Sequence, residues 1–183
     1  QNSDGATALI MACVKGYSRV ACRLLEAGAD PFLRTKHRTD AMNYADVGKN
    51  LEVMAMICRL AKPGTQFAVS TTLTDACEAD DVETIASWLD FGGPIDTQWT
   101  FNGKREGKKV KDNLTLLQIV AANDSQGLAA LLIERKASVN LQNEDGFTVL
   151  IAATQAGNTP LVRLLLEAGA DSSLCTTNGE MAI

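Results

Sequence analysis

The chain has 183 residues and a net charge of −5, with 46% of its residues apolar and 21% charged. This length is enough for one domain with a sizeable core, and the composition is typical of soluble globular proteins. No apolar stretch approaches the roughly twenty residues that a membrane-spanning helix needs, so a transmembrane segment is excluded.

Cysteine and histidine usage argues against a metal site or a disulfide framework. The five cysteines are an odd number without a close pair, and His37 is the only histidine. Zinc sites need clustered ligands, which this spacing does not offer. The sequence also lacks a Gly-rich phosphate loop and a recognisable Cys–His pair. We therefore expect free thiols in a reducing compartment, cytoplasm or nucleus, no metal or cofactor, and no enzymatic activity.

A unit of about thirty-three residues recurs along the chain. Its opening, Asp4 to Ala12, returns as Asp145 to Ala153, and Leu24 to Asp30 returns as Leu165 to Asp171. Self-similarity at this period is typical of a solenoid of stacked supersecondary units. In chain order we expect five units and the start of a sixth, near residues 4–36, 37–67, 68–111, 112–144, 145–177 and 178–183.

Each unit is predicted to hold two short helices joined by a turn. The buried face of the first helix is marked by an apolar residue with a small or apolar residue three positions later, beginning at Leu9, Met42, Leu73, Leu117 and Leu150. The second helix carries an apolar stripe that begins at Val20, Val53, Thr84, Leu128 and Leu161. Neither helix is long enough to be stable alone. The pattern therefore predicts an all-α repeat solenoid whose stability comes from stacking.

One step in the period is longer than the rest. Ala12, Ala45, Ala76, Val120 and Ala153 follow one another at 33, 31, 44 and 33 residues, so the third unit has gained eleven. In the inserted segment, residues 97–111, Asn102-Gly103 is a strong signal for a two-residue hairpin turn. A turn there pairs Phe101 with Lys104, Thr100 with Arg105 and Trp99 with Glu106. Side chains alternate along a strand, which sets Trp99, Phe101 and Lys104 on one face.

This aromatic and basic hairpin is a candidate recognition site. Tryptophan and arginine are enriched at binding hot spots, where an anchor can supply about 2 kcal/mol. The candidate residues are Trp99, Phe101, Lys104, Arg105, Lys108, Lys109 and Lys111. The alternative is that Trp99 and Phe101 pack onto the next unit, while the five bases of residues 99–113 screen the seven acids of residues 65–98.

The pattern resembles the ankyrin repeat. The matching residues are Asp-Gly-x-Thr-x-Leu at the start of the first and fifth units, an Ala in the first helix, and Leu-Leu-Glu-Ala-Gly-Ala-Asp at the end. The resemblance implies stacked helix-turn-helix units joined by β-hairpin fingers, one of them enlarged. The family's Thr-Pro-Leu-His tetrapeptide lacks Pro and His in every unit, which should weaken the helix starts. Neither end resembles a polar cap, so we expect one repeat domain over residues 1–183 that is part of a longer protein.

The resemblance also implies a binding surface made of finger tips and the exposed ends of first helices. Those positions include Lys36, His37, Asn123, Phe147 and Gln155. For any one of them alone, a solvated surface residue is the simpler interpretation. Ankyrin-like repeats can also be hydroxylated on an Asn near the finger, the slot of Asn140, although an Asn that hydrogen-bonds the finger backbone is the simpler interpretation.

Three functions from different classes remain open. The repeat architecture and the exposed hairpin favour a non-enzymatic scaffold that binds another protein through finger tips, the concave helix surface and the enlarged hairpin. The alternative is an anionic ligand, nucleic acid or phospholipid, held by the basic hairpin, although the acidic net charge disfavours nucleic acid. The array could also be a regulatory or targeting domain of a larger enzyme or channel. Nothing in the sequence indicates a homo-oligomer.

Overall fold

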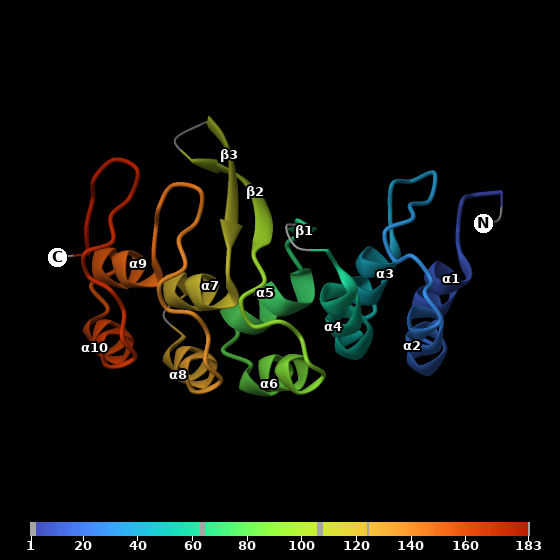
Figure 1. Cartoon of the computed structure of the whole chain (residues 1–183), viewed down its shortest axis with the longest axis horizontal. Coiled ribbons are helices and arrows are strands. Elements are labelled where there is room, and N and C mark those ends of the chain that lie inside the picture. The colour runs from blue at the N-terminus through green and yellow to red at the C-terminus, as the bar shows by residue number, and fades with distance from the viewer. Residues whose placement is uncertain (1–2, 63–64, 106–107, 124, 183) are drawn as a thin grey trace. The chain divides into compact units, whose positions relative to one another are not determined.

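A computed structural model describes residues 3–62, 65–105, 108–123 and 125–182, with residues 101–105 and 108–111 described by their backbone alone (Figure 1). Ten helices in these ranges form five pairs. In chain order they are α1 (Ala8–Val14) and α2 (Ser18–Glu26), α3 (Ala41–Val47) and α4 (Leu51–Leu60), α5 (Thr71–Glu78) and α6 (Val82–Asp90), α7 (Leu116–Ala122) and α8 (Gln126–Glu134), and α9 (Val149–Gln155) and α10 (Thr159–Glu167). Each pair lies where the apolar spacing predicted it, so the repeat fold class is confirmed.

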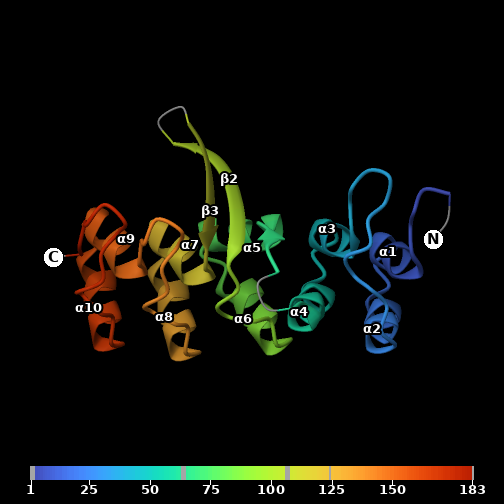
Figure 2. The ribbon, with the colours of Figure 1, turned by 45° about the horizontal axis from the view of Figure 1, so that its top comes forward.

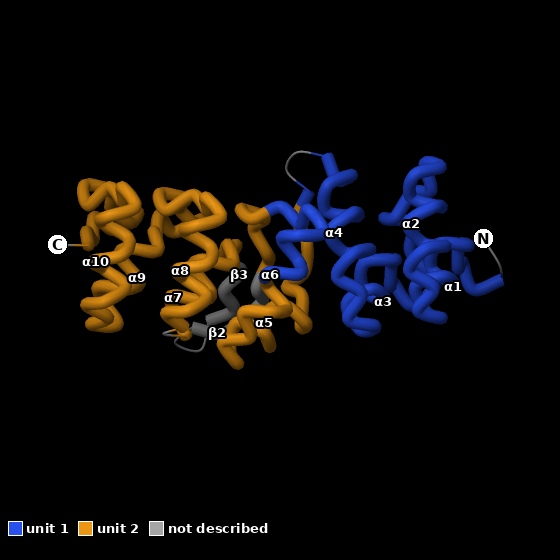
Figure 3. The backbone as a smooth tube through the Cα atoms, turned by 90° about the horizontal axis from the view of Figure 1, so that it is seen from below, with its two compact units in different colours: residues 1–65, 86–94 blue, residues 66–85, 95–183 orange. Residues whose placement is uncertain are grey.

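The chain divides into two compact units, which Figure 3 shows in different colours. Unit 1 comprises residues 1–65 and 86–94, and unit 2 comprises residues 66–85 and 95–183. The division passes through α6, whose first turn belongs to unit 2 and whose remainder belongs to unit 1.

Side-chain caps define the start of every first helix. The backbone N–H of the third helical residue donates to the preceding cap at 3.1–3.3 Å, the caps being Thr7, Asp40, Ser70, Thr115 and Thr148. At Asp40 and Thr115 the bond is reciprocated, which completes a capping box. Such a cap contributes about 0.5–2 kcal/mol. The starts that lack the family's Pro are therefore specified by capping.

The turns between paired helices use the left-handed backbone region. Gly16 and Gly157 have φ of 69° there, and Lys49 and Asp80 adopt φ of 51° and 52° at the same position of their units. This region costs a non-glycine residue about 1–2 kcal/mol. Packing around the turns of the second and third helix pairs therefore offsets some of this backbone strain.

Unit 1 is a stack of two helix pairs completed by the end of α6. Helix α1 packs on α2 and α3, and α4 packs on α2 and α3. The side-chain amide of Asn50 also donates to the hydroxyl of Ser18 at 2.7 Å, which joins the two turns. Further along, Trp88 is fully buried and lies so close to Gly93 that a Cβ there would be 2.2 Å from the indole. The close approach explains why a glycine stands at position 93.

Unit 2 combines stacked helices with a three-stranded sheet. Helix α7 packs on α5, α8 and α9, and α10 packs on α8 and α9. Strand β1 (Phe67–Ala68) pairs in parallel with β2 (Trp99–Arg105), which pairs antiparallel with β3 (Lys108–Leu114). Strands β2 and β3 form the enlarged finger, which extends beyond the other fingers of unit 2 on the side of α7 and α9 (Figures 1 and 2).

The hairpin register differs from the predicted one. Arg105 pairs with Lys108, and Asn102 and Gly103 pair with Lys111 and Val110 within the strands. The turn expected at Asn102-Gly103 is therefore wrong, and the pairings Phe101–Lys104, Thr100–Arg105 and Trp99–Glu106 do not form. The strand ends decide the register, because Trp99 pairs with Leu114 immediately before the Thr115 cap of α7. A turn at Asn102-Gly103 would have left the second half of β3 without a partner strand.

Candidate functional site

The base of the hairpin lies in the core of unit 2. Trp99 is only 1% exposed, and its indole packs against Phe67 with ring centroids 5.8 Å apart. Trp99 therefore cannot serve as an exposed anchor. Its ring contact is with Phe67 of the preceding finger, and the alternative in which it packs onto the next unit stays a prediction. Its packing partner comes from β1, which neighbours β2 because the two strands pair in parallel. The side chain of Phe101 lies outside the described part of the chain.

A polar network fixes the hairpin base to the next finger. The buried hydroxyl of Thr100 donates to the amide oxygen of its strand partner Asn113 at 2.8 Å, and the amide nitrogen of Asn113 donates to Glu144 at 2.7 Å. One residue earlier, the carboxylate of Asp112 accepts from the amide of Asn143 at 2.8 Å. Consecutive residues of β3 thus hold consecutive residues of the neighbouring finger.

The carboxyl group of Asp112 has a raised pKa in this arrangement. Partial burial raises the pKa of its carboxyl above the usual range, the bond from Asn143 opposes that rise, and the nearby carboxylates of Asp145 and Glu144 add to it. Three acids therefore lie at the base of a finger whose outer part, residues 104–111, carries five bases. The basic character of the hairpin is confined to its outer part.

Gln118 positions the finger that carries Phe147. Its side-chain nitrogen donates to the backbone oxygens of Leu141 at 3.2 Å and Phe147 at 3.0 Å. Its oxygen accepts from the backbone of Thr115 at 2.9 Å. Gln118 stands in the slot where the ankyrin pattern has His, and it bonds both the helix start at Thr115 and the neighbouring finger. Gln118 was not among the predicted site residues, although a polar residue inside an otherwise apolar helix was a visible signal.

The remaining predicted contact residues are distributed over both units. Lys36 and His37 are exposed on a finger of unit 1, where the backbone nitrogen of Lys36 donates to the oxygen of Asp4 at 2.9 Å. In unit 2, Asn123 and Gln155 are exposed at the ends of α7 and α9, and Phe147 is half-buried. For Lys104, Arg105, Lys108, Lys109 and Lys111 the structure describes the strand backbone, and their contact with a partner stays a prediction.

Exposed apolar residues mark a further surface on unit 1. Val14 and Val47 end the equivalent helices α1 and α3, which pack together, and Val47 is 81% exposed. Met11, one turn earlier on α1, is also exposed. Met11 and Val14 were not predicted to be exposed, because they lie in an apolar run that looks uniformly buried. The finger residues Phe32 and Leu33 are exposed as well.

Asn140 uses its side chain to join two loops. Its nitrogen donates to the backbone oxygen of Gly169 at 3.2 Å, and its oxygen accepts from the backbone of Asp171 at 2.8 Å. This geometry agrees with the interpretation of Asn140 as a residue that hydrogen-bonds the finger backbone.

The described residues show little that could support catalysis. Burial raises the pKa of the Cys13 thiol to about 11 and those of Cys58 and Cys77 to about 12, which leaves little reactive thiolate at neutral pH. Among the residues with assigned positions, no group of His, Cys, Asp and Glu is arranged to hold a metal ion. None of the helices in the described ranges is long and apolar enough to cross a membrane.

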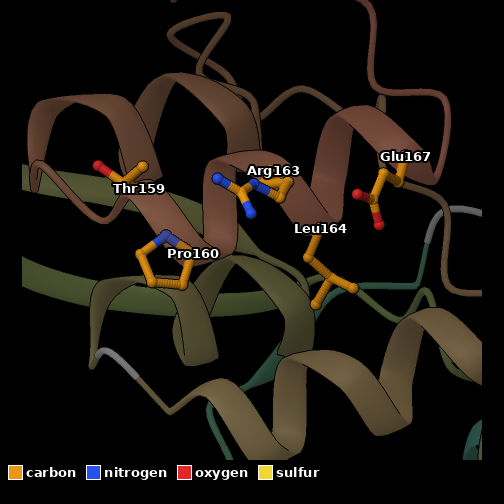
Figure 4. A pocket seen from close by; sticks show the side chains of 5 residues that line it. All are labelled: Thr159, Pro160, Arg163, Leu164 and Glu167. Carbon is orange, nitrogen blue, oxygen red and sulfur yellow. The ribbon is translucent and has the colours of Figure 1, made fainter.

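A pocket of about 420 Å³ lies on the outer helix of the fifth pair. All the side chains shown to line it project from α10 (Figure 4), namely Thr159, Pro160, Arg163, Leu164 and Glu167. One face of one helix does not bring acid, base and nucleophile together from several elements, so this pocket resembles a surface hollow rather than a reaction site.

Five pairs of helices joined by fingers, with polar side chains that hold neighbouring fingers of unit 2 together, define a tandem-repeat protein of the class that presents an extended surface to other macromolecules. The chain belongs to the ankyrin repeat family: a profile of three ankyrin repeats matches residues 73–174, and a single-repeat profile matches residues 4–36.

Three relatives illustrate the similarity. The human B-cell lymphoma 3 protein is 29% identical over 179 residues, covering 94% of this chain and 37% of that protein. Ankyrin repeat family A protein 2 from Bos taurus is 26% identical over 159 residues, covering 83% and 49%. The crystal structure of the ankyrin repeat domain of Bcl-3, a unique member of the IkappaB protein family, superposes with a TM-score of 0.60 at 27% identity over 99% of this chain and 78% of that chain. The chain thus spans less than half the length of these two full-length relatives.

Proposed function

We propose that this chain is a non-enzymatic module that binds another protein through its finger tips, the exposed face of its first helices and, above all, the enlarged hairpin. Ankyrin repeat domains generally serve as protein-interaction modules and are typically non-catalytic, which supports the general function. The observation that carries the particular site is the fixed base of the hairpin, where Asn113 and Asp112 hold Glu144 and Asn143 of the next finger.

A fixed base favours binding because it lowers the entropy lost on association. Each hydrogen bond at the base stabilises the ordered finger by about 1 kcal/mol. The buried side chain of Trp99 adds an apolar contact that fixes the same region. A loop ordered before contact does not pay this ordering cost when the partner arrives. The hairpin is therefore suited to present β2 and β3 as an extended two-stranded surface.

The strand register places positive charges opposite each other in the outer hairpin, which favours binding of an anionic partner. It pairs Lys104 with Lys109 and Arg105 with Lys108. Like charges at directly opposed strand positions are destabilising. An acidic segment of a partner protein would offset this repulsion, which supports a role for Lys104, Arg105, Lys108, Lys109 and Lys111 in recognition.

A second contact surface is proposed on unit 1. The neighbouring first helices α1 and α3 expose the apolar side chains of Met11, Val14 and Val47. The finger between α2 and α3 exposes Lys36 and His37. An apolar patch with a polar rim is typical of protein interfaces. In unit 2, Phe147, Asn123 and Gln155 would extend contact around the hairpin.

We also propose that the protein is located in the cytoplasm or the nucleus. Three of its cysteines are buried as free thiols, with their pKa values raised by burial, and Cys175 is an exposed free thiol. Free cysteines are expected where the cell keeps thiols reduced.

Charge inversion on the hairpin tests the proposal. Lys104→Glu with Lys109→Glu keeps a like-charged strand pair but reverses its sign, so the hairpin's own stability should change little. Capture of protein partners from extracts of the cells that make this protein should fall at least tenfold. The matched control, Lys15→Glu with Arg19→Glu, makes the same charge change on exposed residues of unit 1 and should retain capture by the hairpin. Equal capture by both variants would refute the hairpin as the binding site.

The five bases favour one other candidate, an anionic ligand such as nucleic acid or phospholipid. Phosphate binding releases counterions and so weakens steeply with salt. Fluorescent single-stranded DNA and anionic phospholipid vesicles, each titrated at two salt concentrations, separate this candidate from an acidic protein. Because the chain spans only part of its relatives, a regulatory role beside another domain is also proposed, and capture with the full-length protein would test it.

A further inference from the structure

The enlarged hairpin has one strand edge that β1 covers only at its base. The strands of the sheet follow the order β1-β2-β3, so β1 lies on the side of β2 that faces away from β3. Pairing with β1 involves Trp99 and Thr100 of β2, which continues to Arg105. Figure 1 shows the hairpin extending past β1. Among the strands that the structure describes, none lies on that side of residues 101–105, called here the open edge.

The chain that follows β1 explains why its cover ends there. The backbone nitrogen of Val69 donates to the oxygen of Thr100 at 3.1 Å. The next residue, Ser70, is the cap of α5, and its hydroxyl accepts from the backbone nitrogen of Leu73 at 3.1 Å. The backbone therefore turns into the helix directly after Val69 and does not continue along β2.

The backbone of the open edge directs hydrogen-bonding groups outward at every second residue. In an antiparallel pair, successive residues direct their N–H and C=O groups alternately toward the partner strand and away from it. Thr100 directs its oxygen to Val69, away from β3. Asn102 and Lys104 therefore direct their groups to the same side, and the residues between them bond β3. Such a row on a strand edge is a template for pairing with another chain.

The charge of the hairpin selects the kind of strand that fits the open edge. Lys104 pairs with Lys109 and Arg105 pairs with Lys108, so the edge lies beside four bases. A second copy of the chain would bring the same bases against them, and like charges at opposed positions are destabilising. An acidic strand is attracted instead.

The other edge of the hairpin fits an acidic strand less well. Asn113 of β3 donates to the carboxylate of Glu144 at 2.7 Å, and the carboxylate of Asp112 accepts from Asn143 at 2.8 Å. The next finger therefore lies beside the base of β3. The carboxylates of Asp112, Glu144 and Asp145 lie near one another there and would repel an acidic segment. The open edge of β2 has no such finger bonded to its base, because β1 occupies that position.

We propose that the open edge binds an extended acidic segment of a partner protein, which adds to the sheet as a fourth strand. Main-chain hydrogen bonds to Asn102 and Lys104 hold the segment, and acidic side chains at alternate positions meet the bases of the hairpin. This strand pairing rests on the proposed function of the hairpin, and it specifies the conformation and the charge pattern of the bound partner.

A heptapeptide that alternates glutamate and valine tests the pairing. Fluorescence anisotropy should detect its binding to the 183-residue chain. A control peptide of the same sequence with N-methylated amides keeps the charge but cannot donate main-chain hydrogen bonds, so it should not bind. In the complex, amide exchange at Lys104 should slow at least tenfold more than at Gly103, whose N–H is directed to β3. Equal binding of the two peptides, or equal slowing at the two amides, would overturn the strand pairing.

Two substitutions at one position separate main-chain pairing from charge. Lys104→Thr removes the charge and keeps the N–H, whereas Lys104→Pro removes both. Proline is tolerated on edge strands where its nitrogen faces outward, so the contacts between residues 105 and 108 should persist in both variants. Lys104→Pro should bind the peptide at least tenfold more weakly than Lys104→Thr. Equal affinities with an intact hairpin would refute the strand pairing and leave recognition by charge in place.

Two further outcomes concern the hairpin as a whole and its occupant. If Lys104→Glu with Lys109→Glu leaves binding of the peptide unchanged, the proposed function of the hairpin fails together with the strand pairing. Sedimentation of the chain alone should show a monomer. A dimer that Lys104→Pro dissociates would assign the open edge to a second copy and overturn the acidic segment as its occupant.

Discussion

The indole of Trp99 packs against the phenyl ring of Phe67, with centroids 5.8 Å apart and planes tilted by 48°. The contact lies where β1 and β2 pair, since Phe67 and Trp99 are also partners in the parallel register. Both side chains are buried. The enlarged finger therefore grows out of packed structure, and changes at its base should affect folding as well as binding.

Replacing Trp99 with Ala should destabilise the protein by about 3–5 kcal/mol, because the change empties a buried aromatic site. Urea unfolding, followed by the fluorescence of Trp88 or by circular dichroism, measures the loss. Val47→Ala is the matched control, since Val47 is 81% exposed and surface changes usually stay within about 0.5 kcal/mol. Equal midpoints for the two variants would contradict the burial of Trp99.

Gln118→Ala should cost about 1–3 kcal/mol. It removes the side-chain donor to the backbone oxygens of Leu141 and Phe147, of which the oxygen of Phe147 keeps the bond from the backbone nitrogen of Asn143. Gln118→His, which restores the residue type of the ankyrin pattern, should recover part of the loss. Chemical denaturation of the three proteins gives the ranking. A His variant no more stable than the Ala variant would show that the finger contact does not depend on a donor at position 118.

The helix pairs could be predicted because the same requirement repeats in every unit. Leu9 and Ala12 must face a neighbouring pair, and so must Leu150 and Ala153, so apolar spacing marks both the helices and their buried sides. The caps were less visible. Thr7 and Ser70 begin helices through a single side-chain bond each, and such a short polar residue has the same appearance in a loop.

The hairpin was harder to predict because its determinants are distant in sequence. Trp99 is buried by Phe67, which lies in the preceding finger, and no local pattern links the two. The Asn102-Gly103 signal was strong, but it competed with a buried strand end at Trp99 and a helix cap at Thr115. Packing at both ends of the hairpin outweighed the turn preference. The hydrogen bond from Asn113 to Glu144 likewise joins residues that are thirty-one positions apart in the sequence.

A double-mutant cycle on Asn113 and Glu144 should measure how strongly the hairpin is held to the next finger. We expect a coupling free energy of about 1 kcal/mol between Asn113→Ala and Glu144→Ala, because the pair makes one charge-assisted bond of 2.7 Å at a partly exposed site. Affinity for an acidic partner should fall in either single variant through loss of order at the base. Additive unfolding free energies would show that the bond contributes no stability.

The buried thiols should make the protein less stable at high pH. The folded pKa values of Cys58 and Cys77 are raised by burial from 9.0 to about 12, so above pH 9 the unfolded chain releases protons that the folded chain retains. Stability from each thiol is therefore present below pH 9 and is lost as pH rises toward 12, by up to about 1.4 kcal/mol per pH unit. Urea midpoints between pH 8 and 11 should fall more steeply for the unmodified chain than for Cys58→Ala. Parallel slopes would contradict the raised pKa.

Strand-favouring residues at positions 102 and 103 separate the two hairpin registers. Asn102 and Gly103 lie inside β2, opposite Lys111 and Val110, so Asn102→Thr with Gly103→Val should preserve or strengthen the pairing, because β-branched residues favour strands. A turn at these positions would instead be disrupted, since it needs positive φ at both residues. Backbone contacts between residues 105 and 108, observed by nuclear magnetic resonance, should persist in the double variant. Loss of these contacts, together with unfolding of the finger, would show that the turn lies at Asn102-Gly103.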